Sequence, residues 1–208
     1  MSDKPEGGRR GGVTRRTFFR TAGIAAAAGA LFREVPAIAQ DAKAPAIRTQ
    51  GPGPVKLTLL VNGTKREVSV EPRRTLLDTL RGEIDLTGAK RVCDRGTCGA
   101  CTVWLDGTPV YACTLLAVEC EGRAITTVEG LGTPDKPHPV QKAFWREDAM
   151  QCGFCTPGFV MSTAWAVKTY GKALTEEQVK AATAGNLCRC GTYPHVVRAA
   201  LAAAKDRA

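Results

Sequence analysis

The chain is poor in aromatic side chains, and beyond residue 39 it has no run of basic residues with aromatics between them. Phe, Trp and Tyr together make up 6% of its 208 residues. Proteins that bind nucleic acids combine a basic surface with aromatic rings that stack on bases. We therefore expect no nucleic-acid partner.

The chain also lacks a long apolar run. The stretch Ala22–Phe32 consists mainly of alanine and glycine, and it is much shorter than the ~20 apolar residues that span a bilayer. We expect no membrane span in the mature chain.

Residues 1–39 have the pattern of an export signal. In TRRTFFR, at 14–20, two arginines precede two aromatic residues, and the apolar stretch follows. The small residues of Ala37-Ile38-Ala39 offer a cleavage site that would leave Gln40 as the new N-terminus. The pattern predicts a twin-arginine signal and a periplasmic location. Without this segment the formal charge falls from +9, because 22 Lys and Arg remain against 17 Asp and Glu.

Cysteine is abundant, and eight of the nine fall into two sets of four. The first set is Cys93, Cys98, Cys101 and Cys113. Its Cys-x4-Cys-x2-Cys spacing, with a fourth cysteine further on, is typical of a plant-type [2Fe-2S] ferredoxin. Gly96 and Gly99 allow backbone angles with positive φ, so the loop can wrap a cluster and turn its N–H groups toward the sulfurs. The spacing therefore predicts electron transfer.

The second set consists of two close pairs, and its members are Cys152, Cys155, Cys188 and Cys190. The first pair precedes Thr156-Pro157, a predicted cap and first helical residue, and the second precedes Tyr193-Pro194. Two helix N-termini aimed at one point would offset part of the negative charge of a thiolate-bound cluster. A capping box from Thr175 to Gln178 predicts an intervening helix that Gly185-Asn186 can end, so that the two pairs meet. This pattern predicts a second [2Fe-2S] cluster.

Two other uses of the thiols stay open. Disulfides suit an exported chain, but the tight glycine-rich loop of the first set disfavours them, and 208 residues can form a core without them. The spacing of the first set fits zinc poorly, whereas the second set alone could form a four-cysteine zinc site. Cys120 is left over, and we expect it to be a small buried apolar side chain.

The remaining pattern divides the chain into two domains after a linker at residues 40–54. Residues 55–132 are expected to form a small sheet with one helix capped by Thr75, and residues 138–205 have helical periodicity. Two of the strand pairs are joined by turn dipeptides typical of hairpins, Asn62-Gly63 and Asp106-Gly107. The expected strands are Val55–Val61, Arg66–Val70, Thr102–Leu105, Pro109–Ala112 and Ala124–Val128. The predicted fold class is α+β, a ferredoxin-like β-grasp domain followed by an all-α helical bundle.

Three motifs, CDRGTCGACTV at 93–103, QCGFCTPG at 151–158 and GNLCRCGTY at 185–193, resemble those of the iron–sulfur subunit of the xanthine oxidase family of molybdenum hydroxylases. With the twin-arginine signal and ITTVEGLG at 125–132, the chain is most similar to the small subunit of a periplasmic aldehyde oxidoreductase. It departs from the family at Val92, where a glycine usually precedes the first ligand.

The resemblance implies a chain of electron carriers that serves the oxidation of aldehydes to carboxylic acids. A large partner subunit would hold a molybdopterin cofactor, and a third subunit would usually hold FAD. Electrons would pass from molybdenum to the helical-domain cluster, then to the ferredoxin-like cluster and on to FAD. The resemblance also implies that Gln151 and Cys190 lie against the pterin, and that this chain alone has no substrate-turnover site.

Other functions are compatible with parts of the pattern. An N-heterocycle hydroxylase that passes electrons to a cytochrome would use a similar small subunit. A free-standing ferredoxin would need only the first domain, and a zinc-stabilised binding module would need no redox chemistry. His138 is expected to lie in a loop and His195 in the first turn of a helix, and neither is expected to be a ligand. In a Rieske-type site two histidines replace two of the four cysteines, whereas here all four cysteines of each set are present. Three charged residues flank the ligands and could tune a potential, dock a partner or simply be solvated: Asp94, Arg95 and Arg189.

Overall fold

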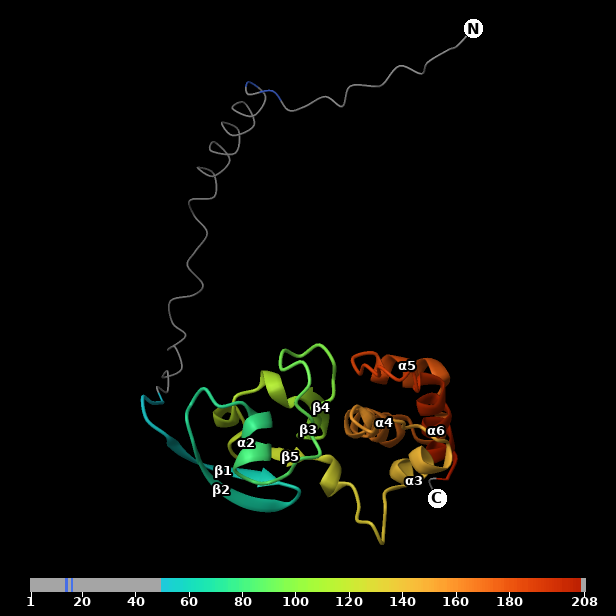
Figure 1. Ribbon diagram of the computed structural model, residues 1–208, viewed down its shortest axis with the longest axis horizontal. Helices are drawn as coiled ribbons and strands as arrows, with labels where there is room; N and C mark the ends of the chain where they lie inside the picture. The colour runs from blue at the N-terminus through green and yellow to red at the C-terminus, as the bar shows by residue number, and fades with distance from the viewer. Residues whose placement is uncertain (1–13, 15, 17–49, 207–208) are drawn as a thin grey trace, which may run out of the picture. The chain divides into compact units, whose positions relative to one another are not determined.

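The computed structural model describes Thr14, Arg16 and residues 50–206. The predicted export signal, apart from those two residues, and most of the predicted linker lie outside this part of the chain. Residues 50–206 belong to one compact unit (Figure 1). Within residues 50–206, no helix combines the length and the apolar character that crossing a membrane requires.

The first half of this unit is a five-stranded sheet built from two hairpins and a fifth strand. Strand β1 (Val55–Val61) pairs antiparallel with β2 (Thr64–Val70), and β3 (Thr102–Leu105) pairs antiparallel with β4 (Thr108–Tyr111). Both two-residue turns have positive φ at each position, 51° and 77° at Asn62-Gly63 and 51° and 81° at Asp106-Gly107. These are the angles that a type I′ turn needs, and both predicted hairpins are confirmed.

The fifth strand joins the hairpins into one sheet of order β2-β1-β5-β3-β4. Strand β5 (Ala124–Thr126) runs parallel to β1 and antiparallel to β3. It is shorter than predicted, because the chain turns into a 3-10 helix at Val128–Gly130. Helix α2 (Leu76–Gly82) begins at the predicted cap, where the Thr75 hydroxyl accepts a hydrogen bond from the N–H of Asp78 at 3.1 Å. Its leucines share one buried core with the sheet.

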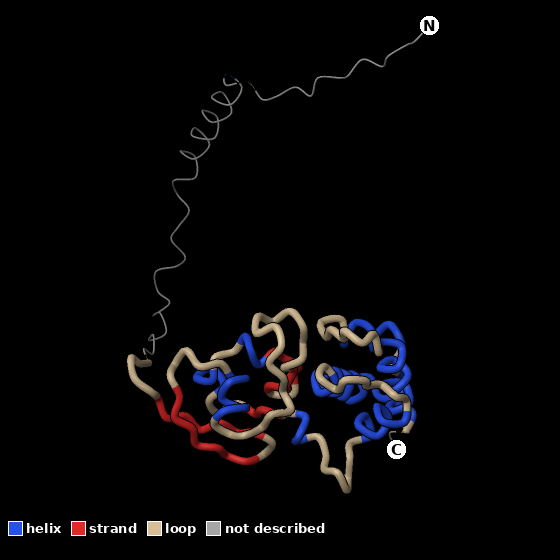
Figure 2. The backbone as a smooth tube through the Cα atoms, viewed as in Figure 1, coloured by secondary structure: helices blue, strands red, loops and turns tan. Residues whose placement is uncertain are grey.

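The second half contains four α-helices: α3 (Pro139–Arg146), α4 (Thr156–Tyr170), α5 (Glu176–Thr183) and α6 (Tyr193–Lys205). Helix α4 is buried along most of its length, because it packs on α5 and α6 and also on β3 and β4 (Figures 1 and 2). The capping box from Thr175 to Gln178 is present as predicted, whereas α5 ends at Thr183, slightly before Gly185. The predicted α+β class is confirmed.

The two halves are fastened together by a buried tryptophan. Trp104 comes from β3 but belongs to the core of the helical half, where its indole N–H donates to the carbonyl of Met161 at 3.0 Å. The Lys168 ammonium lies 5.4 Å from the centre of the same ring. These contacts hold α4 against the sheet and fix where the cysteine loops of the two halves can meet.

Candidate metal centres

The first cysteine set lies on a loop without regular secondary structure between α2 and β3, and on a 3-10 helix (Ala112–Thr114) that follows β4. Gly96 and Gly99 have φ angles of 71° and 68°, as the sequence predicted. These angles turn backbone N–H groups toward the thiols. The N–H of Gly96 donates to the Cys113 sulfur at 3.3 Å, and the N–H of Thr97 donates to the Cys93 sulfur at 3.4 Å.

The thiols of this set also act on one another. Burial raises the pKa of Cys101 to about 12, and the neighbouring thiols of Cys113 and Cys98 contribute to the rise. At Cys93 burial acts in the same direction, but hydrogen bonds, those from Thr97 foremost, outweigh it and lower the pKa to about 6. The sequence expectation that these four side chains converge is therefore consistent with their interactions.

The second cysteine set lies at the starts of two helices. Cys155 is the N-cap of α4, and Cys188 and Cys190 lie on the loop that leads into α6. One detail of the prediction is wrong, because Thr156 is the first helical residue rather than the cap. The backbone of Cys155 already has helical angles, which moves the helix start one residue toward the ligand.

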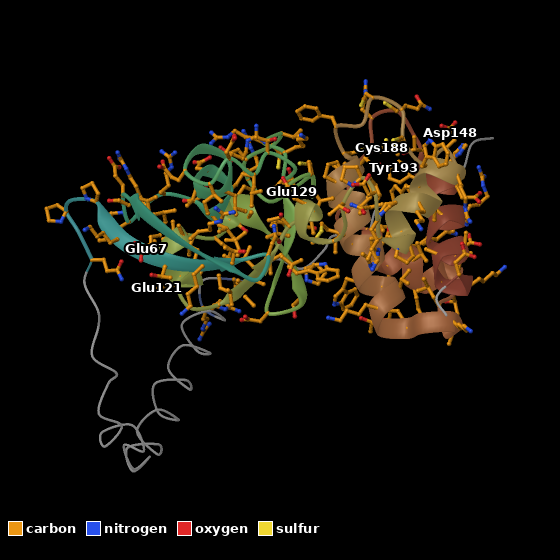
Figure 3. All side chains as sticks on the ribbon, turned by 90° about the horizontal axis from the view of Figure 1, so that it is seen from below. Glu67, Glu121, Glu129, Asp148, Cys188 and Tyr193 are labelled. Carbon is orange, nitrogen blue, oxygen red and sulfur yellow. The ribbon has the colours of Figure 1, made fainter. Side chains whose placement is uncertain are left out.

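Tyr193 and Thr192 hold Cys188 in place. The Tyr193 hydroxyl accepts a hydrogen bond from the N–H of Cys188 at 2.8 Å, and the Thr192 hydroxyl lies 3.2 Å from the Cys188 sulfur. Figure 3 shows the labelled Cys188 and Tyr193 next to each other at one end of the helical half. Sequence reasoning missed both contacts. Its only signal for them was that these residues belong to the GNLCRCGTY motif.

The thiols of the second set interact in the same way as those of the first. Burial, with contributions from Cys188 and Cys152, raises the pKa of Cys155 to about 12. Burial also acts to raise the pKa of Cys188, but hydrogen bonds, led by the Thr192 hydroxyl, lower it to about 7. Cys152 hydrogen-bonds to Cys190, and the electrostatic influence of Cys152 and Cys188 helps to raise the pKa of Cys190. The intervening helix α5 thus brings the two pairs together.

The two sets differ in their exposure to solvent. Three members of the first set are buried: Cys98, Cys101 and Cys113. In the second set only Cys188 is buried, Cys155 and Cys190 are half-buried, and Cys152 is exposed. Gln151, beside Cys152, is exposed as well. The helical-domain set is therefore the one that this chain leaves more open to a partner.

A direct hydrogen bond joins the two loops. The N–H of Leu187, next to Cys188, donates to the carbonyl of Cys98 at 2.9 Å. The buried Asn186 amide reinforces this contact, donating to the carbonyl of Gly99 at 2.9 Å and accepting from the Ser162 hydroxyl at 2.8 Å. Gly158 of α4 lies so close to the Gly99 carbonyl that a side chain there would collide with it. The two cysteine sets are thus held at a fixed separation.

The donor set fits two [2Fe-2S] clusters. All nine cysteines are free thiols, so eight are available as ligands. A two-iron cluster takes two cysteines on each iron, together with N–H groups directed at the sulfurs. Among residues 50–206 no group of three or more His, Cys, Asp or Glu side chains is placed to hold a single metal ion. A two-iron cluster requires only two cysteines on each iron.

The remaining candidate residues lie away from the thiols or serve other purposes. Cys120 is fully buried in the core of the sheet domain. His138 is the N-cap of α3 and accepts from the N–H of Val140 at 3.2 Å, a capping role that the sequence reading did not assign. His195 lies in the first turn of α6 as predicted, 2.9 Å from the carbonyl oxygen of Glu147.

Each half of the chain matches a protein family, and known proteins align with most of its length. Residues 59–126 match the family described as 2Fe-2S iron-sulfur cluster binding domain, and residues 127–201 match the [2Fe-2S] binding domain family. The aldehyde oxidoreductase iron-sulfur-binding subunit PaoA of Escherichia coli (strain K12) is 38% identical over 201 residues, which cover 90% of this chain and 86% of that protein. The chain belongs to the iron–sulfur subunits of the molybdenum hydroxylases.

The chain is also similar to subunits of hydroxylases that act on other substrates. The nicotine 6-hydroxylase small subunit of Paenarthrobacter nicotinovorans is 46% identical over 147 residues, 71% of this chain and 88% of that one. A crystal structure of quinoline 2-oxidoreductase from Pseudomonas putida 86 superposes with a TM-score of 0.68 at 38% identity, covering 73% of this chain and 94% of that one. As an electron-transfer subunit of such a hydroxylase the chain carries two [2Fe-2S] clusters. In molybdenum hydroxylases the molybdenum cofactor and FAD belong to partner subunits.

Proposed function

We propose that this chain relays electrons for a periplasmic hydroxylase that oxidises aldehydes to carboxylic acids. In this proposal Cys93, Cys98, Cys101 and Cys113 hold one cluster. The other is held by Cys152, Cys155, Cys188 and Cys190. When bound, each cluster takes up and returns one electron at a time, so two clusters suit a two-electron oxidation.

The observation that carries the relay is the hydrogen bond between Leu187 and Cys98. Both residues belong to cysteine motifs, Leu187 as the neighbour of Cys188 and Cys98 as a ligand itself. A short series of covalent bonds and one hydrogen bond of 2.9 Å therefore connects the two thiol sets. The more exposed second set is the entry point, beside Gln151 and Cys190, which we propose to face the pterin. The first set is the exit toward FAD.

The aldehyde substrate is supported by the extent of one alignment. The alignment with the aldehyde oxidoreductase subunit covers 90% of this chain. The tenth that it leaves out is shorter than the 39 residues of the predicted signal, so the alignment extends into the signal segment. The nicotine 6-hydroxylase subunit aligns with 71% of the chain. The shared N-terminal segment thus favours an exported aldehyde oxidoreductase.

The second candidate is an N-heterocycle hydroxylase that passes electrons to a cytochrome. Its support is the identity to the nicotine 6-hydroxylase small subunit and the superposition on quinoline 2-oxidoreductase. Because the partner subunit would hold the substrate, an experiment on the whole complex distinguishes the two candidates.

The test isolates the complex that this chain forms with a large molybdenum subunit and an FAD subunit, whose genes are sought in the neighbouring reading frames. Under anaerobic conditions, an aromatic aldehyde should reduce the clusters and bleach their visible absorption, while quinoline should leave them oxidised. Reduction by quinoline but not by the aldehyde would instead establish the heterocycle hydroxylase. If no molybdenum subunit is encoded nearby and none co-purifies, the relay proposal itself fails.

A further inference from the structure

An apolar groove lies between α5 and α6, next to the second cysteine set. It has a volume of about 710 Å³. Its floor includes the buried Phe159 and Val196. Its wall on α6 includes Tyr193, Val197 and Leu201, which are spaced four residues apart and so share one face of the helix.

The apolar surface continues from the groove to the cysteine loops. Leu187 and Tyr193 line the groove and are 55% and 43% exposed. Phe154, on the other loop of the same cysteine set, is 51% exposed. Large apolar side chains that gather in this way on a soluble domain mark an interaction surface. Here the surface surrounds the cysteine set that is itself more open to solvent.

The charged residues at the groove already have partners. The Lys180 ammonium lies 2.6 Å from a Glu176 carboxylate oxygen. Arg198 lies 2.9 Å from the ring of His195 and 3.7 Å from the Glu147 carboxylate. An incoming segment therefore needs no charge of its own to balance the groove, and the apolar floor selects aliphatic or aromatic side chains.

We propose that this groove is the docking site for an apolar segment of the large molybdenum-cofactor subunit. The inference rests on the proposed function, in which that subunit reaches the second cysteine set. A surface that covers Gln151 and Cys190 also reaches Leu187 and Tyr193, and from there the groove continues along α6. The groove thus extends the proposed contact with the large subunit from the cysteine loops to α6. Burial of apolar side chains along α6 supplies affinity for the large subunit.

The test co-expresses this chain with the affinity-tagged large subunit and compares two variants. Val197→Asp combined with Leu201→Asp places two carboxylates in the groove on side chains that are half-buried. Trp145→Asp is the control, since Trp145 lies on α3, is 79% exposed and does not line the groove. We expect the double variant to co-purify with the large subunit about tenfold less than the wild type, and the control to co-purify normally. Both should keep the visible absorption of their clusters.

A photo-cross-linking amino acid at position 197 tests the same contact without depending on how the carboxylates affect folding. Illumination of the purified complex should join this chain to the large subunit, and the same amino acid at position 145 should not. Unchanged co-purification of the double variant, or cross-links that join two copies of this chain, would overturn the docking proposal and leave the relay function intact. A wild-type chain that binds no molybdenum subunit would instead contradict the proposed function.

Discussion

At the scale of single residues, the surroundings of Cys120 differ from those of the other eight cysteines. The eight predicted ligands meet other thiols, hydroxyls or N–H groups, whereas Cys120 is enclosed by the apolar core of the sheet domain. Its sulfur has only a long contact of 3.5 Å to the carbonyl of Leu116. Burial raises the pKa of Cys120 from 9 to about 11. The sequence expectation of a small buried apolar side chain agrees with this position.

This setting predicts how Cys120 reacts. The thiolate is the reactive form, and a pKa of about 11 keeps Cys120 protonated at pH 8. In the folded, cluster-loaded protein, iodoacetamide at pH 8 should leave Cys120 unmodified, and mass spectrometry should find it modified only after unfolding. The raised pKa favours folding below pH 9, and this contribution is lost as the pH rises toward 11.

The variant Cys120→Ala tests whether Cys120 is needed for cluster binding. It should lower the stability by about 1 kcal/mol through the small cavity it leaves, and it should keep both clusters. Loss of iron from this variant would show that Cys120 takes part in cluster binding.

At the scale of elements, one buried polar side chain adds to the contact that Trp104 and Leu187 make between the two halves. Asn186 links the first cysteine loop, helix α4 and the second motif through three hydrogen bonds, the weakest of them 3.3 Å long to the Thr102 hydroxyl. Asn186 thus positions the two cysteine loops, although it contacts neither set of thiols through these bonds. A buried, fully satisfied amide of this kind fixes one arrangement of its neighbours.

Replacing this side chain should loosen the contact. We expect Asn186→Ala to cost about 2–4 kcal/mol, because it leaves the buried Gly99 carbonyl and Ser162 hydroxyl with fewer partners. Ser162→Ala, which removes a single hydrogen bond, should cost about 1 kcal/mol. Thermal unfolding gives the stabilities, and the magnetic coupling between the two reduced clusters reports their separation. A variant with wild-type melting temperature and unchanged coupling would rule out the positioning role.

The local elements could be predicted because their signals are local. Two hairpins follow from Asn-Gly and Asp-Gly, and the caps of α2 and α5 follow from Thr75 and Thr175. The positive φ of Gly96 and Gly99 follows from the ferredoxin spacing. The contact between the halves could not be predicted, because the hydrogen bonds by which Trp104, Asn186 and Leu187 cross from one half to the other join residues more than fifty positions apart.

At the scale of the whole molecule, the proposed location and the cofactors impose an order of events. In the proposed order, iron and sulfide would be inserted in the cytoplasm before export, because the twin-arginine route accepts folded proteins. The prediction of export comes from the arginine pair and aromatics at 14–20 and the small residues at 37–39.

This order predicts the fate of a signal variant. Arg15→Lys with Arg16→Lys should keep the protein in the cytoplasm with both clusters assembled. Arg9→Lys with Arg10→Lys is the matched control, since that pair is not followed by aromatic residues, and it should be exported normally. Cell fractionation and N-terminal sequencing measure the outcome, and mature protein should begin at or near Gln40. Export of the Arg15 and Arg16 variant would refute the signal.

The relay claim requires two clusters held by two separate cysteine sets, and paramagnetic resonance of the reduced complex measures this directly. The wild type should show two distinct [2Fe-2S] signals, because the two sets differ in exposure and in the hydrogen bonds to their sulfurs. Cys98→Ala should remove one signal and Cys155→Ala the other, while Cys120→Ala keeps both. A single signal in the wild type, or zinc in place of iron in the second set, would contradict the account.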